Sequence, residues 1–106
     1  MTKNNKSSLN RCKAVWEKSG GVCAHCGRKA AQPSRTVDHY IPRSWGSGYD
    51  MRNLMPLCKE CNHLRDNRKI NPQTYYKFAS KEAIRQCLEY EQAFISSHRS
   101  MDGNIW

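Results

Sequence analysis

Two Cys-x-x-Cys pairs constrain the fold of this chain more than any other feature of its sequence. The first pair is Cys23 and Cys26, the second is Cys58 and Cys61, and residues 27–57 lie between them. A Cys-x-x-Cys turn presents two thiolates to one ion, and two such turns complete a closed tetrahedral site for zinc. The spacing therefore predicts a structural Zn²⁺ site that ties together two distant segments.

The remaining cysteines, Cys12 and Cys87, have no partner at ligand spacing. We expect both to be core thiols, because a free cysteine packs as a small hydrophobic residue; a reactive thiol is the alternative. His25 stands between the two ligands of the first pair, and we expect it to point to solvent rather than replace one of them.

A metal site suits the length of the chain. A chain of 106 residues buries only a modest core, and zinc binding then contributes much of the folding free energy. The polar residues 1–6 lead into no apolar run, and no segment reaches membrane-spanning length. We therefore expect a cytoplasmic protein with no membrane partner, whose paired thiols bind metal rather than form disulfides.

Basic residues are concentrated near the N-terminus. The net charge is +9, and residues 1–35 contain eight Lys or Arg residues against one acidic residue, Glu17. Such a segment is typical of proteins that contact nucleic acid phosphates. A solvated charged face is the alternative for the charge considered alone.

Hydrophobic periodicity and turn residues predict an α+β fold with a short two-stranded hairpin. A helix capped by Ser8 should run to Gly20, a strand over 35–41 should stop at Pro42, and a second extended segment should cover 53–57. A helix of roughly ten residues should start near Lys59.

Helices are also expected beyond this core, one over 72–79 and a longer one capped by Ser80. Tyr75, Tyr76 and Phe78 are expected to pack beneath a helix, with base stacking as the alternative. We divide the chain into a flexible basic tail (1–7), a zinc-containing core (8–71) and a C-terminal helical extension packed on the core (72–106).

Polar residues with catalytic potential lie in and beside the segment between the cysteine pairs. His39 titrates near neutral pH and is a natural general base. Asp38 and Asn62 offer the hard oxygen ligands that Mg²⁺ or Mn²⁺ prefers, and Asn53 is suited to orienting the histidine. Adjacent residues on a regular strand face opposite sides, so we predict that the strand ends or is irregular at Asp38 and His39.

Each of these residues has a simpler explanation when it is considered alone. An Asp-His pair is usually a surface feature, Asn53 could be a turn residue, and Asn62 could be a helix cap. The hypothesis depends on their conjunction with the cysteines, since Asn62 directly follows Cys61 and is positioned by the same metal.

Three segments together resemble the zinc-containing HNH endonucleases with their ββα-metal core, in the HNN variant. The resemblance covers residues 9–71 and is carried by Cys23–Gly27, by Val37–Pro42 and by Asn53–Asn62. It implies a metal-dependent DNA endonuclease with DNA as partner.

By position, the resemblance assigns the catalytic roles to four residues. His39 would be the general base, Asp38 and Asn62 would hold the catalytic divalent cation, and Asn53 would orient His39. The last motif position is often histidine, and a one-residue shift would place His63 there instead of Asn62. Contacts with DNA are expected from four basic residues: Arg43, Arg65, Arg68 and Lys69.

The family also suggests a biological setting. Small freestanding members occur in bacterial and phage-infected cells, in DNA packaging, restriction or mobile elements, and a homodimer or protein partner would simplify double-strand cleavage. Two other functions stay open: a non-catalytic zinc-knuckle module that binds nucleic acid, and an iron site for electron transfer in a four-thiolate shell.

Overall fold

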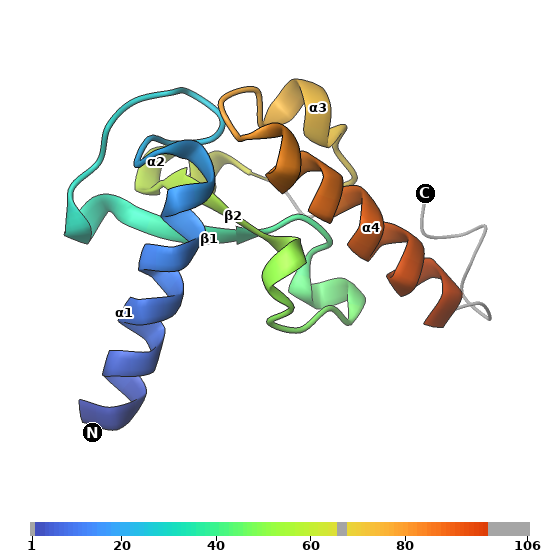
Figure 1. The fold of residues 1–106 in the computed structure, drawn as a ribbon, viewed down its shortest axis with the longest axis horizontal. Coiled ribbons are helices and arrows are strands. Elements are labelled where there is room, and N and C mark those ends of the chain that lie inside the picture. The colour runs from blue at the N-terminus through green and yellow to red at the C-terminus, as the bar shows by residue number, and fades with distance from the viewer. Residues whose placement is uncertain (1, 66–67, 98–106) are drawn as a thin grey trace.

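A two-stranded antiparallel hairpin lies at the centre of the fold (Figure 1). The computed structural model describes residues 2–65 and 68–97, with side chains from residue 9 onward. Strand β1 (Arg35–His39) pairs with β2 (Leu54–Cys58), so that Arg35 lies opposite Cys58 and His39 opposite Leu54. Strand β1 ends at His39, two residues before the expected Ile41, which agrees with the predicted end of the strand at this point; Asp38 and His39 themselves pair regularly with Met55 and Leu54.

Helices flank the hairpin at both ends of the chain, so the predicted α+β fold is confirmed. In Figure 1 the first helix extends away from the hairpin at its N-terminal end, and the last helix lies on the other side of the hairpin. The helices are α1 (Thr2–Trp16), α2 (Lys59–Leu64), α3 (Pro72–Tyr75) and α4 (Lys81–Ser97). Short 3-10 turns connect them: η1 (Glu17–Ser19), η2 (Gln32–Ser34), η3 (Arg43–Trp45) and η4 (Met51–Asn53).

Several helix boundaries differ from those expected. Helix α1 begins at Thr2 rather than at Ser8, because no glycine or proline between them opposes the helical backbone. Most of the segment assigned to a flexible tail is therefore helical. Helix α2 ends at Leu64 because Arg65 adopts an extended backbone, and α3 is shorter than the expected helix over 72–79.

Other boundaries agree with the sequence. The Ser80 hydroxyl accepts a hydrogen bond from the Ala83 amide at 3.1 Å, as expected of a cap. Gly20 ends the first helical region with a φ of 64°. The end of the C-terminal extension lies outside the described residues, and the division into three parts stays a prediction.

A single hydrophobic cluster joins the N-terminal helix, the hairpin and the C-terminal helix. It includes Trp16 from α1, Met55 and Leu57 from β2, and Cys87 and Phe94 from α4. Helices α1 and α4 thus pack against the hairpin and support the loop that joins its strands. No helix in the described part of the chain is both long and apolar enough to cross a membrane.

Candidate active site

The four paired cysteines converge on one point. Their Sγ atoms all lie within 4.8 Å of one another, and those of Cys26 and Cys58 are 4.0 Å apart. A tetrahedral zinc ion with Zn–S bonds of about 2.3 Å separates its sulfurs by about 3.8 Å. The four cysteines are therefore positioned to bind a metal such as zinc.

The first cysteine turn depends on Gly27. Its φ of 79° lies in the left-handed region, and its amide donates to the Cys23 carbonyl at 2.9 Å. A Cβ at this position would lie 2.8 Å from the Phe78 ring. His25 lies outside the cysteine cluster, as expected, but it is half-buried and packs on Tyr75 rather than pointing freely to solvent: the ring centroids are 4.1 Å apart and its Nδ1 lies 2.8 Å from the Tyr75 carbonyl oxygen. The stacking arises because α3 packs over the turn.

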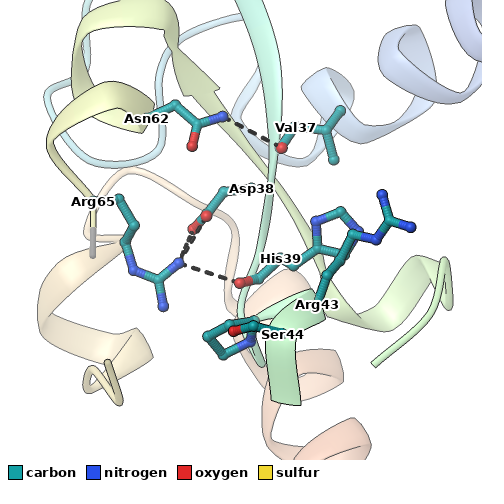
Figure 2. A pocket seen from close by; sticks show the side chains of 8 residues that line it. Val37, Asp38, His39, Arg43, Ser44, Asn62 and Arg65 are labelled. Atoms are coloured by element: carbon teal, nitrogen blue, oxygen red, sulfur yellow. Dashed lines mark hydrogen bonds and ion pairs between the residues drawn. The ribbon is translucent and has the colours of Figure 1, made fainter. Parts of the chain in front are cut away.

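A pocket of about 310 Å³ opens between β1, η3 and the end of α2 (Figure 2). Its walls bring together three of the four residues assigned to catalysis, with two arginines. The lining residues are Val37, Asp38, His39, Pro42, Arg43, Ser44, Asn62 and Arg65. The remaining residue, Asn53, lies outside this pocket.

Asp38 is buried and paired with Arg65. The Arg65 Nη1 donates to both carboxylate oxygens at 2.7 Å, and the Tyr76 hydroxyl donates to Oδ2 at 2.5 Å. Figure 2 shows the guanidinium facing the carboxylate. Burial raises the pKa of Asp38, and the Arg65 charge opposes that rise.

The surroundings of His39 disfavour its positively charged form. Partial burial lowers its pKa, and the positive charges of Arg43 and Arg65 lower it further. Its Nε2 atom is shielded from solvent and has no hydrogen-bond partner among the described residues. An unsatisfied nitrogen of this kind is typical of a site completed by substrate or ordered water.

Asn53 holds the loop that follows His39. Its side chain is fully buried, its Oδ1 accepts from the Ile41 amide at 2.7 Å, and its Nδ2 donates to the Ile41 carbonyl at 3.1 Å. Its own carbonyl accepts from the Tyr40 amide at 2.8 Å. The hydrogen bonds of Asn53 thus fix the path of the backbone at Tyr40 and Ile41, directly after His39.

Asn62 reaches the pocket from the first turns of α2. Its Nδ2 donates to the Thr36 hydroxyl at 2.8 Å and to the Val37 carbonyl at 3.4 Å, the second of which is drawn in Figure 2. Its Oδ1 makes no hydrogen bond within the described residues. His63 is exposed and is not among the residues that line the pocket, whereas Asn62 is.

Comparison with known families agrees with this geometry. Residues 23–68 match the family model of the HNH endonucleases. Over these residues the chain is similar to an HNH domain. The match starts at the first zinc-site cysteine and includes every residue assigned to catalysis. No curated protein sequence matches the chain.

An HNH domain indicates a nuclease or a nucleic-acid-binding function, with a nucleic acid as substrate. The cysteine cluster is compatible with both functions.

The basic residues expected to contact DNA divide into three groups. Arg43 is exposed and lines the pocket of the HNH domain. Arg68 and Lys69 are exposed and do not line this pocket, and the Lys69 Nζ lies 3.8 Å from a Glu91 carboxylate oxygen. Arg65 also lines the pocket, but its side chain is 4% exposed and paired with Asp38, so its contact with DNA stays a prediction. It turns inward because a buried Asp38 requires a positive partner.

Two tyrosines near the site were not predicted from the sequence. Tyr76 was expected to pack in the core, with base stacking as the alternative; it is buried, and its hydroxyl also donates a hydrogen bond to Asp38. Its placement could have been suspected because a buried tyrosine hydroxyl needs a partner. Tyr49 lies beside His39, with ring centroids 5.3 Å apart and an edge-to-face geometry. Nothing in the sequence around Tyr49 indicated this contact.

Proposed function

We propose that this protein is a metal-dependent DNA endonuclease that hydrolyses phosphodiester bonds. The observation that carries the proposal is the pocket of the HNH domain, where Asp38, His39 and Asn62 lie together. One of these residues is a base and two offer oxygen ligands, which is the set that phosphodiester hydrolysis needs.

His39 is the proposed general base. Its neutral imidazole would take a proton from a water molecule, whose oxygen would then attack phosphorus as the P–O bond to the leaving sugar oxygen breaks. The lowered pKa keeps the imidazole able to accept that proton at neutral pH. Asn53 is the proposed positioning residue, since it bonds the backbone just beyond His39.

Asp38 and Asn62 are the proposed ligands of a catalytic Mg²⁺ or Mn²⁺. The chemistry of these side chains fits a cation: Asn62 Oδ1 accepts no hydrogen bond from the described residues. Asp38 Oδ1 accepts one, from Arg65, although a carboxylate oxygen can accept two. A bound divalent cation would stabilise the negative charge that develops on the phosphate.

The alternative is a zinc-knuckle module that binds nucleic acid without cutting it. The discriminating experiment incubates the purified zinc-loaded protein with plasmid, linear duplex and single-stranded DNA, with Mg²⁺, with Mn²⁺ or with neither. Cleavage that requires the added cation supports the endonuclease. Salt-sensitive binding to these DNA forms with no cleavage under any condition would establish the binding module instead.

The proposed oligomeric state follows from the number of candidate active sites in one chain. The described residues contain one such pocket, and one site cuts one strand at a time, so we propose a homodimer or a protein partner for double-strand cleavage. The bacterial or phage setting stays a prediction from the family resemblance.

A further inference from the structure

Two arginine side chains pack against the ring of Tyr49, beside the candidate active site. Its side chain is 50% exposed, on the loop between β1 and β2. The guanidinium carbon of Arg11 lies 4.7 Å from the ring centroid, and that of Arg43 lies 4.9 Å from it. The Arg43 Nη1 also donates to the Tyr49 hydroxyl at 2.9 Å.

No acidic side chain among the described residues pairs with either arginine. Asp50, which follows Tyr49 in the sequence, instead accepts two hydrogen bonds from the Arg52 guanidinium, at 3.0 and 2.7 Å. Two like charges held against one ring repel each other, and a bound anion would relieve that repulsion.

The position of this cluster connects it to the pocket. Arg43 belongs to both, since it lines the pocket and contacts Tyr49. Arg11 comes from α1, which lies outside the residues matched to the HNH family. The cluster therefore extends the basic surface of the pocket beyond the HNH domain, on the side of His39.

We propose that Arg11, Tyr49 and Arg43 form a clamp for a DNA backbone phosphate that flanks the scissile one. The inference rests on the proposed function, because it assumes that DNA lies in the pocket. Arginine suits this role, since its planar fork of donors matches phosphate oxygens. Cation–π contacts with the Tyr49 ring hold both guanidinium groups in place. Less side-chain conformational entropy is therefore lost when the phosphate binds.

The test measures binding rather than cleavage, so that its failure is distinct from failure of the endonuclease. Fluorescence anisotropy of a labelled DNA duplex is recorded with the full-length zinc-loaded protein, across a series of salt concentrations and without added Mg²⁺ or Mn²⁺. Arg11→Ala should weaken binding about five-fold and lower the slope of log affinity against log salt by about 0.9. Tyr49→Leu should also weaken binding, although it removes no charge.

Lys13→Ala is the matched control. Lys13 lies on the same helix and is exposed, but it lines a different groove with Gln32 and Arg35. Its loss should change the affinity less than two-fold, and zinc content and circular dichroism should match the wild type for all variants. Equal loss of affinity in Arg11→Ala and Lys13→Ala, or wild-type binding by Tyr49→Leu, would overturn the clamp.

Discussion

The Arg65 Nη1 lies 2.7 Å from each carboxylate oxygen of Asp38, in a pair whose side chains are 4% and 6% exposed. The same guanidinium donates to the carbonyls of His39 and Tyr40 at 3.2 and 3.1 Å. One arginine at the end of α2 thus holds the end of β1, where the proposed base and metal ligand lie. A buried pair of this kind makes the geometry of the site depend on Arg65.

Replacing Arg65 with methionine should therefore destabilise the protein. It leaves the Asp38 carboxylate buried without its positive partner, which costs about 3–5 kcal/mol of unfolding free energy. Urea unfolding at constant free zinc measures the change. Asp38→Asn combined with Arg65→Met should cost less than Arg65→Met alone, because no charge is then left unpaired. A loss below about 1 kcal/mol for Arg65→Met would show that the pair is not maintained in solution.

Asn53→Ala should impair cleavage more than folding. The substitution removes both side-chain hydrogen bonds to Ile41 and leaves those backbone groups unpaired, a cost of about 1–3 kcal/mol for each buried group. The zinc site lies elsewhere, so zinc content should be unchanged. We expect a lower rate constant under single-turnover conditions at saturating DNA. A variant that is destabilised yet cuts at the wild-type rate would rule out the positioning role.

Zinc removal should unfold the core. Structural zinc contributes about 10–16 kcal/mol of apparent free energy in small zinc-binding peptides, which exceeds the net stability of many domains. Titration with a chelator that prefers zinc to magnesium, followed by near-ultraviolet circular dichroism, should show loss of tertiary signal with release of one zinc ion for each chain. A folded, fully structured chain after complete zinc removal would contradict this.

The zinc site and the meeting of Asp38, His39 and Asn62 could be predicted from the sequence. Metal-ligand spacing is local and nearly independent of the rest of the fold, and Asn62 is covalently attached to a cysteine of the cluster. The end of the strand near these residues was also predicted, although Asp38 and His39 are both paired with β2 and both line the pocket.

The inward turn of Arg65 could not be predicted in the same way. It depends on where α2 ends and on how deeply Asp38 is buried, and both are properties of the packed fold. The start of α1 was missed for a related reason: residues 2–8 contain neither a strong helix breaker nor an apolar stripe, so Ser8 reads equally well as a cap or as an interior residue. The contacts of Tyr49 depend on the path of a loop, which hydrophobic periodicity does not report.

The most direct test of the account compares plasmid cleavage by the wild type and by His39→Ala. Both proteins are loaded with zinc, checked for equal zinc content and circular dichroism, and assayed with Mg²⁺ and with Mn²⁺. The wild type should nick or cut the plasmid only with added cation, and His39→Ala should reduce the rate at least about 100-fold, the usual contribution of a general base. Equal cleavage by the two proteins would contradict the assignment of the site.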